Sequence, residues 1–368
     1  MKTKIPLFKL EDILEKAYNE QVLAEEEIIF LLGLEDEENI NRLFSVARSL
    51  RYRYFGNKVF LYGFLYFSTW CRNYCIFCFY RAPNVLTKRY RKTRDEITQA
   101  ACRLAESGVH LIDLTMGEDP FYRRKNGFKF LVDLVKAVKI ETGLPVMVSP
   151  GVIPKQVLIA LSKAGADWYA CYQETHNPQL FSQLRPGQNY NLRLFTKYFA
   201  KEIGLLVEEG ILTGVGDSLR DIVTSINAMK KIGAHQLRVM SFVPQKGTPM
   251  ESWPSPPRIR ELKIIAVLRL LFPDRLIPAS LDIDGISGLK ERLEAGANVV
   301  TSLIPPQTGL AGVSQSSLDI DEGYRTVKGV LPLIEEVGLM AASREDYFCW
   351  ISNEKERLVK EPVYLEVK

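Results

Sequence analysis

Three cysteines lie close together at Cys71, Cys75 and Cys78, in a C-x3-C-x2-C pattern. Thiolates on one short loop can hold three irons of a 4Fe-4S cluster, because cysteine sulfur is the usual ligand of such clusters. The absence of a fourth cysteine would leave one iron open to another ligand. A zinc site is the alternative, but structural zinc usually has four ligands, and the nearest histidine, His110, has no finger-like spacing. The pattern therefore favours an iron–sulfur cluster with one open iron.

The elements around this loop repeat one unit, an amphipathic helix that stops at a glycine and is followed by a short apolar strand. Helices alternating with strands indicate a parallel sheet. Eight such units are typical of a closed (β/α)8 TIM-type barrel. A doubly wound open sheet is the alternative, but no G-x-G-x-x-G follows the first strand. The predicted strands are 59–67, 109–115, 144–149, 167–172, 205–211, 235–241, 276–281 and 297–302.

The rest of the chain divides around this barrel. Helical spacing of apolar residues predicts an N-terminal helical extension over 1–56, and the barrel core then spans 57–282. Residues 283–350 complete the barrel, and the charged tail 351–368 is expected to be a frayed extension.

Composition narrows the function classes. The 368 residues carry 48 Lys and Arg against 44 Asp and Glu, a net charge of +4, and 46% are hydrophobic. These values describe an ordinary globular protein. The basic cluster Lys88–Lys92 is predicted to be a solvated loop, so no nucleic-acid binding is expected. No apolar run approaches the roughly 20 residues of a membrane helix. We therefore expect a cytoplasmic protein without a membrane or nucleic-acid partner.

Polar residues follow the predicted strands where a barrel enzyme places its chemistry, at their carboxyl ends. A site for a diamino acid needs carboxylates for its ammonium groups and an arginine for its carboxylate. Asp113, Arg238 and Asp282 could supply these groups. The alternative is an internal Asp–Arg ion pair that only fills the barrel mouth.

The cysteine loop, with Phe77 just before the last cysteine and a strand just before the loop, resembles the signature of radical S-adenosylmethionine (SAM) enzymes. The resemblance implies that SAM chelates the open iron. One-electron reduction of the cluster then cleaves SAM to methionine and a 5′-deoxyadenosyl radical, which abstracts a substrate hydrogen. An electron donor such as flavodoxin or ferredoxin is implied as a partner.

The same resemblance assigns the cofactor residues. Gly117 and Glu118 would receive the SAM amino group, and Glu174 would contact the ribose. Arg193 would hold the SAM carboxylate as in biotin-synthase-like members, although it could instead be a solvent-facing helix residue. The segment 210–217 would line the adenine, although it could be a plain strand-to-helix turn. The expected SAM-contacting residues are Phe77, Gly117, Glu118, Ser149, Glu174, Arg193 and Thr213.

The other three cysteines help to decide between the activities found in this superfamily. Cys102, Cys171 and Cys349 are too scattered to hold a second cluster and are predicted to be free buried thiols. Sulfur insertion is therefore disfavoured. Longer stretches resemble the methylornithine synthases from about residue 20 to Trp350; they are 66–71, 111–120, 210–216, 238–245, 276–282 and 296–302.

That resemblance implies an isomerase for the first step of pyrrolysine biosynthesis. L-Lysine would lose a hydrogen, fragment, and recombine at another carbon to give (3R)-3-methyl-D-ornithine. The expected substrate-binding residues are Asp113, Arg238, Ser280, Asp282, Thr301 and Ser302. Two alternatives remain: a radical SAM enzyme of the hydrogenase-maturase type acting on another small amino acid, and a non-catalytic metal-binding module. A monomer is expected.

Overall fold

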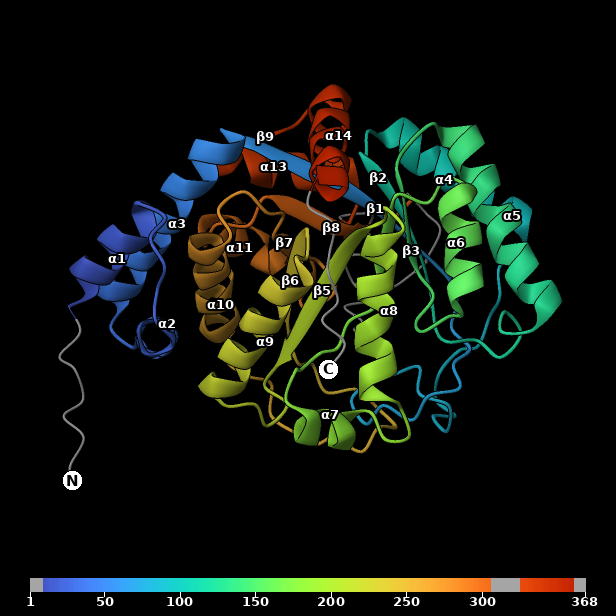
Figure 1. Cartoon of the computed structure of the whole chain (residues 1–368), viewed down its shortest axis with the longest axis horizontal. Coiled ribbons are helices and arrows are strands. Elements are labelled where there is room, and N and C mark those ends of the chain that lie inside the picture. Colours follow the sequence, from blue (N-terminus) through green and yellow to red (C-terminus); the bar gives the residue numbers. More distant parts are fainter. Residues whose placement is uncertain (1–8, 306–324, 361–368) are drawn as a thin grey trace.

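Eight parallel strands form the barrel in the computed structural model, which describes residues 9–305 and 325–360. The strand order is β6-β5-β4-β3-β2-β1-β8-β7. All eight predicted strands are present, and Figure 1 shows them surrounded by helices. Their bounds are β1 Lys58–Ser68, β2 Leu111–Met116, β3 Val146–Ser149, β4 Trp168–Ala170, β5 Leu206–Thr213, β6 Gln236–Ser241, β7 Pro278–Ser280 and β8 Val299–Leu303.

The barrel closes between β6 and β7 only at the amino ends of these strands. The Leu237 amide donates to the Leu276 carbonyl at 2.9 Å, and the Leu276 amide donates to the His235 carbonyl at 3.1 Å. Beyond Leu276 the ladder between the two strands stops among the described residues. Strands β6 and β7 are therefore not paired with each other near their carboxyl ends, which is where the barrel interior must admit ligands.

The helices of the barrel begin and end where the sequence supplies caps. Thr93 accepts from the Glu96 amide at 3.3 Å and starts α4, and Gly108, with φ of 101°, ends it. Only glycine adopts that backbone conformation cheaply. The helices are α4 Arg94–Ser107, α5 Lys125–Thr142, α6 Lys155–Lys163, α7 Pro178–Leu184, α8 Tyr190–Glu202, α9 Leu219–Ile232, α10 Arg258–Leu271, η1 Gly285–Gly288, α11 Leu289–Glu294 and α13 Val327–Glu336.

Three helices of the described residues precede the barrel: α1 Leu10–Tyr18, α2 Glu25–Leu32 and α3 Glu37–Phe55. They pack beside α10 at one side of the barrel (Figure 1). Ile13, Leu31 and Leu43 are buried in this contact. Removing such side chains from water is worth about 1.5–3 kcal/mol each, so the extension is part of the main core.

The amino end of the barrel is covered by α14, Arg344–Lys360, at the top of Figure 1. The Tyr347 hydroxyl donates to that of Tyr62 at 2.6 Å, and the Trp350 ring stacks on Trp168 with centroids 5.8 Å apart. Ile351 and Glu354 are buried. The expectation of a frayed tail from residue 351 is therefore wrong as far as Lys360, because apolar side chains on one face of this helix fill the barrel floor. Residues 361–368 lie outside the described range.

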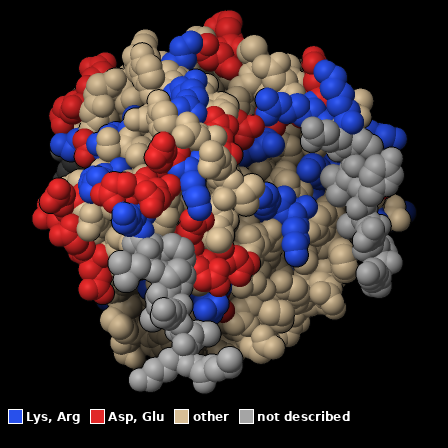
Figure 2. Space-filling view, turned by 60° about the vertical axis from the view of Figure 1, so that its left-hand side comes forward, with Lys and Arg blue, Asp and Glu red and all other residues tan. Residues whose placement is uncertain are grey.

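A short strand, β9 Met340–Ala341, leads into α14 and pairs with the start of β1. None of the helices in the described ranges is both long enough and apolar enough to span a bilayer. On the face shown in Figure 2, acidic and basic side chains are intermixed, without one continuous basic area.

Candidate active site

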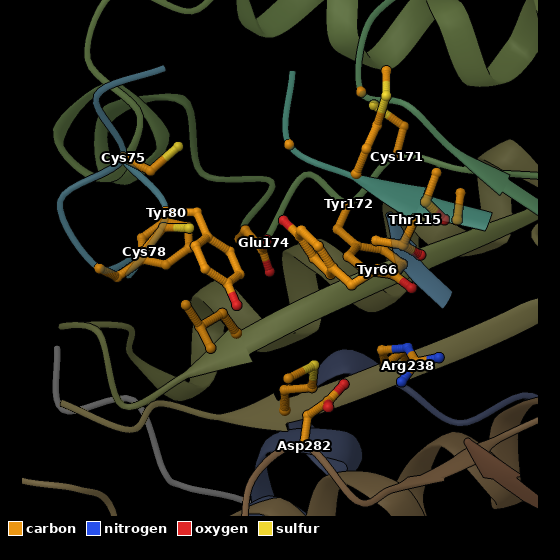
Figure 3. A pocket seen from close by; sticks show the side chains of 18 of the residues that line it. Tyr66, Cys75, Cys78, Tyr80, Thr115, Cys171, Tyr172, Glu174, Arg238 and Asp282 are labelled. Carbon is orange, nitrogen blue, oxygen red and sulfur yellow. The ribbon is translucent and has the colours of Figure 1, made fainter. Parts of the chain in front are cut away.

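One cavity at the carboxyl end of the barrel gathers most of the predicted site residues. Figure 3 shows Cys75 and Cys78 on one side and Arg238 and Asp282 on the other, with Tyr66 and Tyr172 between them. The predicted residues that line it are Cys71, Cys75, Phe77, Cys78, Asp113, Gly117, Glu118, Ser149, Glu174, Arg193, Arg238, Asp282, Thr301 and Ser302.

The loop that carries the three cysteines follows β1 directly and is fixed by backbone contacts. The Arg72 amide donates to the Glu118 carbonyl at 3.1 Å, and the Ile76 amide donates to the Leu184 carbonyl at 3.0 Å. Arg89 donates to the carbonyls of Thr69, Tyr80, Arg81 and Asn84. The basic cluster 88–92 is thus not simply a solvated loop, because Arg89 donates hydrogen bonds to carbonyls on both sides of the three cysteines.

Gly117 lets the β2 loop approach the cysteine loop closely. A Cβ atom at Gly117 would overlap the Trp70 carbonyl oxygen and lie 3.0 Å from the Cys71 Cβ. The Gly117 amide donates to the Ser68 carbonyl at 2.9 Å. Glycine is required here by this close approach, and it places the predicted SAM-contacting segment against the cysteines.

The cysteines fit an iron–sulfur cluster. Burial raises the pKa of Cys71 to about 11, and burial followed by the charges of Cys75 and Cys71 raises the pKa of Cys78 further. Metal cations would offset both effects, because thiolates are the ligating form. Among the described residues, no three His, Cys, Asp or Glu side chains converge on one point suitable for a single ion. A cluster instead binds each cysteine through a different iron.

Two side chains contact the Cys75 sulfur. Gln188 Nε2 lies 3.0 Å and Arg185 Nη1 3.4 Å from Cys75 Sγ. Arg185 also pairs with Glu174 Oε1 at 2.5 Å. Hydrogen bonds to cluster sulfurs tune the potential of iron–sulfur centres. Glu174 has a φ of 69°, a strained conformation for a residue other than glycine.

Glu118 lies between the cysteine loop and α8. Its carboxylate is 3.2 Å from Arg193 Nη1 and 3.1 Å from Arg72 Nη2. Burial alone would raise the pKa of Glu118, but Arg193 holds it below its usual value. Arg193 is buried on α8 and faces this cavity, so it is not a solvent-facing helix residue.

The cavity floor contains a cluster of polar side chains inside the barrel. Asp113 Oδ1 accepts from Thr115 Oγ1 at 2.8 Å and from Ser149 Oγ at 3.1 Å. Burial, helped by the charge of Glu208, raises the pKa of Asp113 to about 7. Arg238 Nε donates to Glu208 Oε1 at 2.7 Å. Asp113 and Arg238 thus do not form an ion pair with each other.

Asp282 is held at the end of β7 by two neighbours. Its Oδ1 accepts from Arg325 Nη2 at 2.7 Å, and its Oδ2 accepts from Ser302 Oγ at 2.6 Å. Ser302 has a φ of 68°, and its carbonyl accepts from Arg325. Asp282 thus pairs with Arg325, an arginine outside the predicted set, and among the described residues it forms no ion pair with Arg238.

Two predicted residues do not line the cavity. Thr213 is buried, donates to Asp217 Oδ2 at 2.8 Å and accepts from Arg260 Nε at 2.7 Å. Ser280 accepts from the Asp282 amide at 3.3 Å. Both lie behind the residues that face the ligand space, so their contacts support neighbouring loops.

The remaining cysteines differ from the prediction of three buried thiols. Cys171 is buried and lines the cavity, Cys102 is partly buried and Cys349 is exposed. Cys349 is exposed because it lies on α14 away from the face that Tyr347 and Ile351 bury.

Sequence reasoning missed Arg185, Glu208 and Arg325. A signal existed for Glu208, because two adjacent acids, Glu208 and Glu209, stand inside an otherwise apolar strand. Side chains alternate along a strand, so one of the two must point into the barrel. Arg185 and Arg325 stand in loops, and no local pattern marks them.

Comparison with known proteins agrees with this geometry. Residues 65–229 match the radical SAM superfamily model. The chain is 46% identical over 325 residues to 3-methylornithine synthase of Methanosarcina acetivorans, covering 88% of this chain and 92% of the relative. A crystal structure of methylornithine synthase superposes with a TM-score of 0.88 at 43% identity, covering 92% of this chain and 99% of the other.

A more distant relative is the FeFe hydrogenase maturase subunit of Thermotoga maritima. It is 31% identical over 294 residues, which cover 79% of this chain and 82% of the relative. This maturase is less similar to the chain than the synthase is. The chain belongs to the 3-methylornithine synthases of the radical SAM superfamily.

Proposed function

We propose that the protein isomerises L-lysine to (3R)-3-methyl-D-ornithine, the first step of pyrrolysine biosynthesis. The observation that carries this proposal is that one cavity joins the three-cysteine loop to a floor bearing Asp113 and Arg238. When bound, the 4Fe-4S cluster and SAM supply a 5′-deoxyadenosyl radical that removes a hydrogen atom from the substrate. The side chains of the protein would bind the cluster, SAM and lysine, orient them, and enclose the reacting groups.

Cys71, Cys75 and Cys78 would hold the cluster, and the Glu118–Arg193 pair would hold the SAM amino and carboxylate groups. Both ions of this pair are buried and line the cavity. A zwitterion can exchange such a pair for two matched charge-assisted contacts, which are stronger than neutral hydrogen bonds.

Lysine would bind across the floor. The Oδ2 atom of Asp113 accepts no hydrogen bond among the described residues, so it is available to an ammonium group. Arg238 would bind the substrate carboxylate, and Asp282, with Ser302, would take the second ammonium group. Thr301 holds Arg238 Nη1 at 2.9 Å and so orients the guanidinium.

The closed floor suits a reaction that breaks the carbon skeleton. Fragments must be kept from water and from escape until they recombine. Phe60, Trp168 and Tyr347 are buried beneath the cavity, and α14 covers the barrel end. Among the described residues, the barrel therefore opens to ligands at the end that carries the cysteines.

The partner that supplies the electron would approach the cysteine loop, where Arg72 and Tyr74 are exposed. We propose a flavodoxin or ferredoxin in this role, a cytoplasmic location, and a monomer. Gel filtration with multi-angle light scattering checks the last point.

The decisive experiment is an anaerobic assay of the reconstituted enzyme with reductant, SAM and L-lysine, followed by mass spectrometry with chiral separation. A new isomer of lysine that depends on SAM is the expected product. Deoxyadenosine without an isomer would contradict the lysine assignment and favour the hydrogenase-maturase type of activity on another amino acid.

The variant Asp282→Asn tests the substrate assignment. Cluster content should stay at the wild-type level, while the KM for lysine should rise by about tenfold or more, because a charged hydrogen bond contributes roughly 1.5–3 kcal/mol. Loss of the cluster from this variant would show that Asp282 supports the fold and has no role in binding lysine.

A further inference from the structure

Glu208 and Glu209 are adjacent acids in β5, and both are completely buried. They point to opposite sides of the strand. Glu209 faces out of the barrel, where it contacts Lys197 on α8 and accepts from the Gln173 amide at 2.7 Å. Glu208 faces the interior, beneath the cavity floor. A buried carboxylate is costly unless it is fully paired, so each position has a specific set of partners.

Glu208 accepts three hydrogen bonds, two from one strand and one from the loop that follows another. Arg238 Nε and Gln236 Nε2, both on β6, donate to its Oε1 at 2.7 Å each. The Tyr172 hydroxyl, just after β4, donates to its Oε2 at 2.8 Å. The side chain thus joins the two flanks of β5 below the ligand space.

This arrangement fixes the direction in which Arg238 presents its remaining donors. Nε is held by Glu208 and Nη1 by Thr301 Oγ1, while no side chain of the described residues accepts from Nη2. The Tyr172 ring lies under the guanidinium, 5.6 Å from its carbon. Three contacts therefore leave Nη2 as the donor that faces the cavity.

Glu208 also determines the charge of the floor. The groups that face it are Arg238 and Gln236 on β6, Tyr172 after β4, Tyr62 on β1 and Asp113 on β2. Arg238 also feels the charge of Asp282, after β7. With Glu208 neutralising Arg238, neither Asp113 nor Asp282 lies within ion-pair distance of that arginine among the described residues.

We propose that Glu208 is a positioning residue that holds Arg238 back from the cavity carboxylates, so that Arg238 meets the substrate carboxylate and Asp113 stays available to a substrate ammonium group. The inference rests on the proposed function. It predicts a strict preference for amino acids that carry a second ammonium group, because Asp113 keeps an unmatched charge while Glu208 pairs with Arg238. Removing the Glu208 charge would leave Arg238 to pair with Asp113 across the cavity.

The test uses Glu208→Gln in the reconstituted, unreduced holoenzyme with SAM present, where lysine binds without turnover. Calorimetry at pH 8 should show a Kd for L-lysine raised by about 10- to 100-fold, the value of one charged hydrogen bond. In the wild type, lysine binding is expected to weaken as the pH falls through about 7, because burial raises the pKa of Asp113 to about 7. In Glu208→Gln this acid limb should move to lower pH, because loss of the nearby negative charge eases ionisation of Asp113.

The matched control is Glu209→Gln, the neighbouring acid on the other face. It should lower stability but leave the Kd for lysine and its pH profile unchanged. A third variant, Glu208→Asp, keeps the charge with a shorter reach. It should raise the Kd while leaving the acid limb near pH 7, and it takes the place of Glu208→Gln should that variant fail to fold.

Wild-type affinity and an unmoved acid limb in Glu208→Gln would overturn the inference while leaving the proposed function intact. Equal effects of Glu208→Gln and Glu209→Gln on lysine binding would also overturn it, since they would indicate a general structural role. Failure of the wild type to bind lysine or to form the isomer would overturn the proposed function, and the inference with it.

Discussion

Substituting Gly117 by alanine should disable the cysteine loop without unfolding the barrel. Its φ is not in the left-handed region, so the strain comes from space alone. The new methyl group would overlap the Trp70 carbonyl by about 1 Å relative to the roughly 3.5 Å of ordinary contact, and Cys71 Cβ would be only 3.0 Å away. The Trp70–Cys71 backbone must therefore move by on the order of 1 Å. Overpacking of this kind costs about 1–3 kcal/mol.

The effect on function should exceed the effect on stability. Ligating constellations tolerate displacements of roughly 0.5 Å, and a 1 Å misplacement can cost about 100-fold in rate. Anaerobic reconstitution of Gly117→Ala should give a clear loss of iron and acid-labile sulfide per chain, and lysine turnover lowered by about 100-fold. Urea unfolding before reconstitution should show the smaller loss of stability.

A matched control is Gly33→Ala in the N-terminal helices, where the new Cβ would meet the Ile29 carbonyl at 3.2 Å, far from the cysteines in the sequence. This variant should load iron and turn over lysine as the wild type does. Normal iron content and turnover in Gly117→Ala would refute the reasoning, since the loop would then have room that the structure denies it.

Other expected outcomes concern the barrel floor, acid stability and thiol exposure. Tyr347→Phe should lower the free energy of unfolding by about 1 kcal/mol through the lost Tyr62 hydrogen bond, and Tyr347→Ala by about 3–5 kcal/mol in urea titrations; equal losses would contradict the buried ring. Burial opposes ionisation of Glu209, but Lys197 lowers its pKa from 4.5 to about 2, so this group stabilises the fold above pH 4.5 and loses that contribution, on the order of 3 kcal/mol, as pH falls towards 2. Glu209→Gln should flatten that part of the acid unfolding curve, and an unchanged slope would refute the pairing. Cys349 should react with a thiol reagent in the folded enzyme, and protection of it from the reagent would contradict its exposure.

The barrel was predictable because its signals are local. Every strand except β7 follows a glycine near the end of a helix, as at Gly108 before β2. The three cysteines also stand out in the sequence because of their close spacing. They line the cavity together with Glu118 and Arg238, which the sequence analysis also named.

The tail was mispredicted for a physical reason. In the sequence, Ile351 and Glu354 stand among charged residues, so the composition of this segment indicates a polar tail. Its apolar positions at helical spacing become informative only when a barrel floor is present to receive them. Glu354 is buried because it pairs with Arg275, which is 79 positions earlier in the sequence.

Arg325 illustrates the same limit within the site. Nothing in its neighbourhood marks it as a partner of Asp282, which is 43 positions away. The contact exists because the segment before α13 returns to the carboxyl end of β8, where the Ile304 amide donates to the Arg325 carbonyl at 2.9 Å. Long-range pairing of this kind follows from topology, and sequence spacing does not encode it.

The charges of the cavity support the proposal that the site binds an amino acid with an ammonium side chain. Three of the four carboxylates that line it, and Glu208 beneath its floor, are each within 4.0 Å of an arginine, and the described residues place no such partner beside the fourth, Asp113. The group with its charge unmatched is also the one whose pKa burial raises to about 7. An incoming ammonium group would restore the missing charge and favour the carboxylate form, so binding and ionisation support each other. A neutral or acidic side chain would leave Asp113 buried and unpaired. The four matched pairs are Glu118–Arg193, Glu174–Arg185, Glu208–Arg238 and Asp282–Arg325.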